Sequence, residues 1–341
     1  MTTSPDKVGA VHQTAPAVHV RGLRKSYGDL RAVDGIDLEI RRGEIFALLG
    51  PNGAGKTTTV EILEGYRARD DGTVMVLGYD PGRQRQPLKP LIGIVLQSTG
   101  VDGYLTVAET LAMYSSYYPH PRPVDEVIEL VGLTEKRDVR VVKLSGGQQR
   151  RLDVAISLAG DPELLFLDEP TTGFDPSARR EAWEVVKNLA SLGKTVVLTT
   201  HFMDEAQYLA DRVAVIAGGR IVAAGTPATL AGRDMVRARI RYRLPDGPVP
   251  PADLTGAVTG KPSGALGSTG ESAEGGFTEF APDDLTEALH RLTGWAIEQH
   301  VALDRLQIIR PSLEDIYLDL TGPAAVDQPA QSAPRQRRSR R

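Results

Sequence analysis

The 341-residue sequence contains no cysteine, which excludes disulfides, thiolate metal sites and a cysteine nucleophile together. Long apolar runs are lacking as well, because no stretch approaches the ~18–20 residues that a membrane-spanning helix needs. The first residues, MTTSPDKVGAVHQTAPAVHV, show no basic region followed by an apolar block, so they do not resemble a secretory signal. From these absences we expect a cytoplasmic protein that depends on another chain for any membrane span.

A strong excess of charge of one sign is also missing. The chain has 40 lysine and arginine residues against 44 aspartate and glutamate residues, for a formal net charge of -4. Nothing in this balance favours a nucleic-acid partner, and we expect none. The charged fraction of 25% is that of an ordinary globular protein, and the length suits two or three domains.

Apolar patterning predicts an α/β domain in the first two thirds of the chain. The segments AVHVRGLRKSY and VDGIDLEI alternate like half-buried antiparallel strands, whereas EIFALLG, ELLFLDEP and KTVVLTTH are the continuous apolar runs of buried parallel strands. The last two flank the amphipathic helix SARREAWEVVKNLASLG, which Gly193 is expected to cap. Between Gly100 and Gly160 the character is helical, with a capping box at Thr106 and Glu109 and a second helix in VDEVIELVGL.

A change of composition near Arg233 predicts a second, smaller domain. MVRARIRYRL alternates like an edge strand, and a Gly/Pro/Ser-rich stretch follows it. The helix DDLTEALHRLTG, the strand LDRLQIIR and the short helix PSLEDIYLDLTG complete an α+β unit. The tail ends in RQRRSRR, which is either a solvated terminus or a contact for anionic lipid headgroups.

The stretch GPNGAGKT matches the phosphate-binding pattern G-x-x-x-x-G-K-[ST] through Gly50, Gly55, Lys56 and Thr57. A buried strand ends at Gly50 and the helix TTTVEILEGY begins just after Lys56. The glycines let the backbone curl so that successive N–H groups face phosphate oxygens. We expect Lys56 to reach the β- and γ-phosphates and the Thr57 hydroxyl to bind Mg²⁺.

Two carboxylates follow the apolar run LLFL. Asp168 stands at the strand end and Glu169 comes next. Parallel strands beside a phosphate loop deliver their carboxyl ends to one crevice, so Asp168 is expected to hold Mg²⁺, largely through water. Glu169 would accept a proton from an attacking water. The alternative, a solvated turn, fits poorly after so apolar a run.

Two further polar residues stand at strand ends. His201 closes VVLTTH, and Gln97 follows LIGIVL. A lone histidine is more often structural than catalytic, and Gln97 by itself is weak evidence. Their place at strand ends that face the same crevice favours a contact of His201 with the γ-phosphate.

The stretch VKLSGGQQRRLD predicts a second anion-binding turn. Ser145, Gly146 and Gly147 open a basic helix, whose N-terminal N–H groups attract an anion. A complete phosphate loop already lies upstream, so the residues alone leave open why one chain carries a second anion-binding turn.

Taken in order, these residues resemble the nucleotide-binding domain of ATP-binding cassette (ABC) transporters, from about Val18 to Leu230. The match comprises an aromatic residue ahead of the phosphate loop (Tyr27), the loop itself, Gln97, the signature LSGGQ, LLFLDEP, the D-loop GFDP and His201. Phe174 replaces the leucine usual in the D-loop, a change that we expect to be tolerated. Gln149 follows the signature at a position that the family leaves variable.

The resemblance implies a fold of the α/β class: a P-loop NTPase with a RecA-like parallel sheet, an antiparallel β subdomain, a helical subdomain at about 98–160 and the small C-terminal α+β domain. The implied organisation is a disordered leader (1–16), the nucleotide-binding domain (17–232), the accessory domain (233–322) and a disordered basic tail (323–341).

The resemblance also implies the site residues. Catalysis would use Glu169, His201 and Gln97, and Mg²⁺ would be held by Thr57, Gln97 and Asp168. ATP would contact Tyr27, Gly50, Asn52, Gly53, Gly55, Lys56, Thr57, Thr58, Ser145, Gly146, Gly147, Gln148 and Asp175. In the family each ATP lies between the phosphate loop of one subunit and the signature of its mate, so the chain must pair with a second copy or a similar chain. Asp175 would lie at that seam and link the two sites.

The C-terminal segment PSLEDIYLDLTG and the stretch THFMDEAQYLADRVAVIAGGRIVAAGTPATL resemble the ATP-binding subunits of type-2 exporters, the daunorubicin-resistance-like group. This implies a peripheral subunit on the cytoplasmic face of the membrane that drives a separately encoded permease to export a drug, antibiotic or lipid-like substrate. The segment PSLEDIYLDLTG can also be read simply as an amphipathic helix that covers the sheet of the small domain, and the two interpretations are compatible. The alternatives are a soluble ABC ATPase acting on ribosomes or DNA, and a non-hydrolysing scaffold protein, against which Glu169 and His201 argue.

Overall fold

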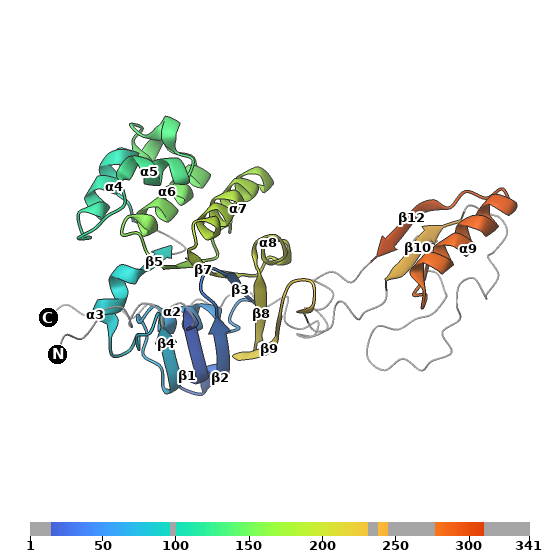
Figure 1. Ribbon diagram of the computed structural model, residues 1–341, viewed down its shortest axis with the longest axis horizontal. Coiled ribbons are helices and arrows are strands. Elements are labelled where there is room, and N and C mark those ends of the chain that lie inside the picture. Colours follow the sequence, from blue (N-terminus) through green and yellow to red (C-terminus); the bar gives the residue numbers. More distant parts are fainter. Residues whose placement is uncertain (1–14, 96–99, 231–237, 245–276, 310–341) are drawn as a thin grey trace, which may run out of the picture. The chain divides into compact units, whose positions relative to one another are not determined.

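The computed structural model describes residues 15–95, 100–230, 238–244 and 277–309 (Figure 1). One compact unit ends at Pro227 and the next begins at Ala228. Within the described residues, no helix is both long and apolar enough to cross a bilayer.

The core of the first unit is a mostly parallel sheet, in which six described strands follow the order β5-β6-β7-β3-β8-β9. The strands are β3 (Ile45–Leu49), β5 (Ile92–Val95), β6 (Leu164–Asp168), β7 (Thr195–Thr200), β8 (Arg212–Ala217) and β9 (Arg220–Gly225). Only the β8–β9 pairing is antiparallel. Every residue of β3 and β7 is buried, as expected for strands covered on both faces. The predicted α/β fold is confirmed.

A second, antiparallel sheet has the order β2-β1-β4, with β1 at Val18–Tyr27, β2 at Leu30–Ile40 and β4 at Asp71–Val76. Its strands alternate buried and exposed residues, so one face turns to the core. Helix α2 (Lys56–Leu63) contributes Val60, Ile62 and Leu63 to a cluster that also contains side chains of both sheets. The phosphate loop therefore emerges from a rigid, two-sided core.

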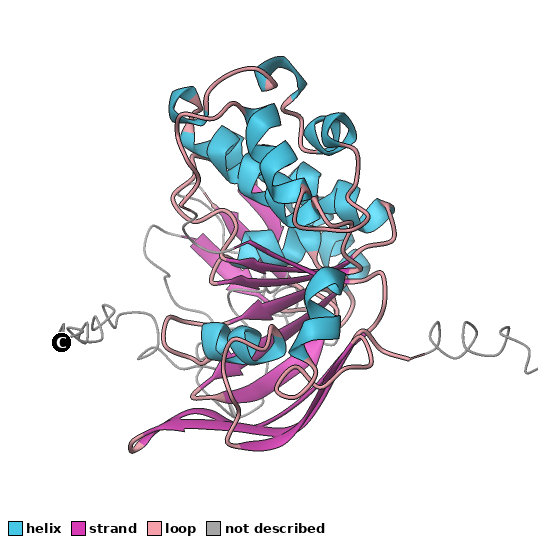
Figure 2. Ribbon diagram, turned by 90° about the vertical axis from the view of Figure 1, so that its left-hand side faces the viewer, coloured by secondary structure: helices cyan, strands magenta, loops and turns pink. Residues whose placement is uncertain are grey.

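Helices α4 (Val107–Ser115), α5 (Val124–Leu130) and α6 (Gly146–Leu158) gather at the end of this unit away from the antiparallel sheet (Figures 1 and 2). Thr106 and Glu109 form the predicted capping box at the start of α4. Helices α7 (Pro176–Ser191) and α8 (Met203–Leu209) pack against β7. Beyond α7, Gly193 has a φ of 79° and donates to Ala190 O at 2.8 Å, as a helix-ending glycine does.

The second unit contains a three-stranded antiparallel sheet of described residues with the order β11-β10-β12 and the helix α9 (Leu285–Glu298). The strands are β10 (Arg239–Arg243), β11 (Phe277–Phe280) and β12 (Asp304–Ile309). Ile240 and Tyr242 of β10 form the core with Ala288 and Leu292 of α9.

Two predictions for this unit were wrong. β10, which we expected at an edge, is the central strand, because alternation reveals one buried face but not whether each side of a strand finds a partner. Helix α9 runs past Gly294 to Glu298, since Ala296 is buried beyond the glycine and holds the last turn in place. The predicted helix 311–322 and the basic tail lie outside the described residues.

Candidate functional site

The phosphate loop joins β3, at the centre of the parallel sheet, to α2. Gly53 and Gly55 have φ values of 80° and 105°, which favour glycine, and a Cβ on Gly55 would lie 2.2 Å from Ala32 O. Asn52 and Gly53 are exposed at the tip of the loop, whereas Gly50 and Gly55 are buried. Thr57 is exposed and Thr58 is half-buried in the first turn of α2.

Lys56 is the buried cation of this loop, with 5% of its surface exposed. Its Nζ donates to Gly50 O at 2.7 Å and to Pro51 O at 3.1 Å, and it lies 3.7 Å from Glu169 Oε1. Burial lowers the pKa of Lys56, while the carboxylates of Glu169 and Asp168 act to raise it. The chain thus places one ammonium group where the loop turns its backbone inward.

Asp168 ends β6, next to β7 in the sheet. Thr199, its register partner on β7, donates its hydroxyl to Asp168 Oδ1 at 2.5 Å. This bond occupies one carboxylate oxygen and orients the side chain at the carboxyl edge of the parallel strands.

Glu169 adopts a left-handed backbone conformation, with a φ of 45° that is rare for a residue with a Cβ. Its N–H is held by Thr199, at 3.0 Å from Oγ1 and 3.2 Å from the carbonyl oxygen. Its carboxylate accepts the Thr172 hydroxyl at 3.0 Å through Oε2 and lies 3.2 Å from His201 Nδ1 through Oε1. The strained turn thereby aims the carboxylate back toward Lys56.

His201 follows β7 and has about a third of its side chain exposed. An ionised Glu169 can only accept a hydrogen bond, so the contact places the imidazole proton on Nδ1. Nε2 is then the nitrogen left for another partner. The structure therefore brings together Lys56, Asp168, Glu169 and His201, which the sequence places in three separate segments.

The signature turn begins α6. Ser145 caps the helix: its Oγ accepts Gln148 N–H at 3.3 Å, and the Gln148 side chain accepts Ser145 N–H at 3.0 Å. Ser145 and Gly146 are exposed, and a Cβ on Gly146 would meet nothing within 4 Å. Within the described residues, no hydrogen bond or ion pair joins this turn to the phosphate loop of the same chain.

Tyr27 ends β1 with 39% of its surface exposed. Its ring centroid lies 5.7 Å from Lys25 Nζ and 5.3 Å from Arg67 Cζ, so cations flank an exposed aromatic ring. Gln97 lies outside the described residues.

Asp175 caps α7 by accepting the N–H groups of Ser177 and Ala178, both at 2.9 Å. We expect Asp175→Ala to lower the free energy of unfolding by about 1 kcal/mol, because the cap is lost. Asp175→Asn should retain most of that stability, since asparagine caps equally well. Urea denaturation of the three proteins checks this, and equal losses for both variants would show that the carboxylate does not act as a cap.

Sequence reasoning missed four residues of this region. Thr199 and Thr172 hold Asp168 and Glu169 as described above, and Arg150 of α6 contacts the backbone on either side of Glu169. Glu205 of α8 is 1% exposed and accepts Thr171 Oγ1 at 2.7 Å and Trp183 Nε1 at 3.1 Å. Burial raises its pKa. For Thr199, Arg150 and Glu205 the only available signal was a polar residue within a buried segment, and their partners are distant in sequence. Thr172 is exposed and lies only three residues from its partner Glu169, in a turn whose shape the sequence did not predict.

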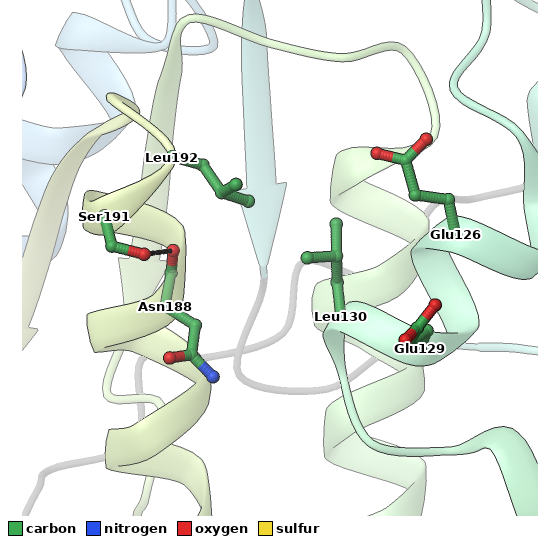
Figure 3. Close-up of a pocket in the computed structure, with 6 residues that line it drawn as sticks. All are labelled: Glu126, Glu129, Leu130, Asn188, Ser191 and Leu192. Atoms are coloured by element: carbon green, nitrogen blue, oxygen red, sulfur yellow. Dashed lines mark hydrogen bonds between the residues drawn. The ribbon is translucent and has the colours of Figure 1, made fainter.

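A pocket of about 300 Å³ lies between α5 and α7, and none of the predicted site residues lines it (Figure 3). Glu126 and Glu129 line it from α5, and Asn188, Ser191 and Leu192 line it from α7 and its C-terminus. Its carboxylates make it unsuited to a polyphosphate.

The phosphate loop, by contrast, fits a nucleoside triphosphate. It combines glycines that no larger residue could replace without strain, a buried ammonium group and an exposed aromatic ring on the adjoining sheet. Mg²⁺ is usually held by one or two carboxylates together with substrate phosphates. Asp168 would supply such a carboxylate, and the Thr57 hydroxyl would supply a further oxygen. The fold and the phosphate-loop pattern together define a P-loop NTPase.

Comparison with known proteins places the chain more narrowly. The family "ABC transporter" matches residues 33–172, and "ABC transporter domain-containing protein-like, C-terminal domain" matches residues 238–312. Nod factor export ATP-binding protein I of Ralstonia nicotianae is 38% identical over 324 residues, or 91% of this chain and 95% of that protein. The daunorubicin/doxorubicin resistance ATP-binding protein DrrA of Streptomyces peucetius is 36% identical over 327 residues, or 94% and 97%.

Solved structures share the fold of this chain. CbiO1 of Clostridium perfringens, described as part of the ABC transporter complex cbiONQ, has a TM-score of 0.57 at 29% identity and covers 63% of this chain and 90% of its own. The ATP-binding cassette MJ1267 in its ADP conformation has a TM-score of 0.57 at 23% identity, with 62% and 92% covered. The chain belongs to the family of ABC transporter ATP-binding proteins and is an ATPase that binds ATP. The predicted resemblance to the daunorubicin-resistance-type subunits is confirmed.

Proposed function

We propose that this protein is the ATP-hydrolysing subunit of an exporter: two copies close around two ATP molecules and drive a separately encoded permease. The relatives named for daunorubicin resistance and Nod factor export support the export of a drug, antibiotic or lipid-like substrate. The subunit would act at the cytoplasmic face of the membrane, bound to the permease.

The observation that carries the pairing is the signature turn. The first N–H groups of α6 have no acceptor within the helix, and the Ser145 hydroxyl, which accepts from Gln148, still has its own proton to donate. Within the part of the chain that the structure describes, no hydrogen bond or ion pair joins this open anion site to the phosphate loop, so we assign the turn to the ATP that a second copy holds on its own loop.

Each site residue then takes a role in this proposal. Lys56 and the loop N–H groups hold the phosphates, and Tyr27 stacks on adenine. Asp168, Thr57 and Gln97 would hold Mg²⁺, which would supply positive charge to the phosphates. Glu169 orients the attacking water and accepts its proton, and His201 contacts the γ-phosphate through Nε2. The bond from His201 Nδ1 to Glu169 keeps these two groups in a fixed mutual orientation.

A mixing experiment tests whether the two sites are shared. Lys56→Ala removes the phosphate-binding ammonium, and Ser145→Asp keeps a good helix cap but sets a negative charge where the phosphate would approach. Each variant alone should be inactive, because both sites of its dimer are damaged. A mixture should regain roughly a quarter of wild-type ATPase activity, since half of the randomly formed dimers are mixed and each has one intact site.

The control is the double variant carrying both changes in one chain, mixed with Lys56→Ala, which can form no intact site. ATP hydrolysis is measured by phosphate release as the mixing ratio is varied. If the complementary mixture is no more active than its separate components, the shared site is ruled out and each chain must work alone.

A further inference from the structure

One arginine of α6 reaches the strained turn at Glu169. Arg150 is 8% exposed, and its Nη2 donates to Asp168 O at 3.1 Å while its Nε donates to Pro170 O at 3.3 Å. These two carbonyls lie on either side of Glu169. One guanidinium group therefore holds the backbone both before and after the residue that we assign as the base.

The left-handed conformation of Glu169 explains why such a clamp is needed. A φ of 45° is unfavourable for a residue with a Cβ and persists only where neighbours hold it. Thr199 holds the N–H of Glu169 from β7, and Arg150 holds the flanking carbonyls from α6. Removing either support would let the turn relax and move the carboxylate.

The guanidinium group of Arg150 is a buried charge whose partners offset the cost of burial. Burying a guanidinium group is unfavourable unless its donors are satisfied, and burial lowers the pKa of Arg150. Asp153, one turn further along α6 and 9% exposed, lies 3.7 Å from Nη1 and balances the charge. The planar fork of Arg150 reaches two separate carbonyls through two nitrogens while its third nitrogen lies near a carboxylate.

Helix α6 also carries the signature turn at its start. Ser145 precedes Arg150 by five residues, which is about 8 Å along the helix axis. The anion-binding turn and the support of the Glu169 turn thus belong to one rigid element.

We propose that Arg150 is a positioning residue for ATP hydrolysis, which keeps the Glu169 carboxylate in place by holding the carbonyl groups of Asp168 and Pro170. The inference rests on the proposed role of Glu169 as the base. It concerns the rate of hydrolysis and not the affinity for ATP, because these hydrogen bonds of Arg150 go to backbone carbonyl groups of the Glu169 turn and not to the phosphate loop.

The test compares Arg150→Lys with Arg151→Lys in the full-length chain. Lysine keeps the charge but has one nitrogen in place of the two that meet the carbonyls of Asp168 and Pro170, so we expect kcat to fall about tenfold to a hundredfold, as a displacement of roughly 1 Å does. The Kd for ATP, measured in EDTA by fluorescence of a labelled nucleotide, should change less than twofold. Arg151, which donates to Gly132 O and pairs with Glu181, is the matched control and should leave both quantities near wild type.

Asp153→Asn is a second variant in case lysine at position 150 prevents folding. It removes only the charge that faces the guanidinium group, and it should lower kcat in the same direction by a smaller factor with ATP affinity retained. Wild-type kcat in folded Arg150→Lys, or equal losses of kcat and affinity in either variant, would overturn the proposal.

Glu169→Gln is measured alongside, to separate the role of Arg150 from that of the base. If Glu169→Gln keeps wild-type turnover, the assignment of the base fails. An inactive Glu169→Gln together with a fully active Arg150→Lys rejects the role of Arg150 alone.

Discussion

Glu169→Gln is expected to lower the kcat of ATP hydrolysis by a factor of about 10²–10⁴, the range attributed to a positioned general base. Glutamine has nearly the same shape and can still accept the Thr172 hydroxyl, so the turn that holds position 169 should persist. What it lacks is the negative charge that takes a proton from water. ATP should therefore bind normally and remain uncleaved.

The second readout of this variant is its oligomeric state. If ATP joins two copies and hydrolysis separates them, Glu169→Gln in Mg-ATP should run as a dimer in light scattering, and the same protein in ADP should run as a monomer. Glu135→Gln, which changes an exposed carboxylate on the helical subdomain, is the control and should turn over ATP at the wild-type rate. Normal hydrolysis by Glu169→Gln would mean that another group takes the proton.

The largest effect on stability is expected at Glu64, the residue that follows α2. Its side chain is 5% exposed, and burial, with added repulsion from Asp168 and Glu61, raises its pKa from 4.5 to about 8. At neutral pH the folded protein therefore keeps Glu64 protonated while the unfolded chain releases the proton. A neutral Glu64 also spares the site a further negative charge near Asp168.

The direction of the pH effect follows from that difference. Below about pH 4.5 the proton is bound in both states; between pH 4.5 and 8 only the folded state binds it, so this group lowers stability as the pH rises through the window. Glu64→Gln removes the penalty and should raise the free energy of unfolding by on the order of 3 kcal/mol at pH 7, and by little at pH 5.

Urea denaturation of wild type and Glu64→Gln between pH 5 and pH 8 measures this effect. The gap between the two unfolding free energies should widen steadily with pH. Glu129→Gln, on the exposed side of α5, is the matched control and should run parallel to wild type, because surface changes of this kind stay within about 0.5 kcal/mol. A constant gap between Glu64→Gln and wild type would contradict the buried proton.

The local pattern of the sequence was sufficient for much of the fold. Continuous apolar runs predicted β3, β6 and β7, and the Thr106–Glu109 capping box predicted the start of α4, because these features depend on neighbours a few residues away. The edge position of β10 was wrong and the end of α9 was misplaced, since strand partners and the burial of Ala296 are decided by distant parts of the chain.

The order of residue types along the chain by itself determined that this protein carries a glycine loop of the phosphate-binding pattern, two adjacent carboxylates and a signature turn, because each of these motifs is built from consecutive residues. Only the tertiary structure decided which groups touch. The register of β6 beside β7 sets Thr199 against Asp168, and the packing of α6 brings Arg150 to the carbonyls around Glu169. Such contacts join residues far apart in sequence, and a buried hydrogen bond forms only where folding brings its donor and acceptor within about 3 Å.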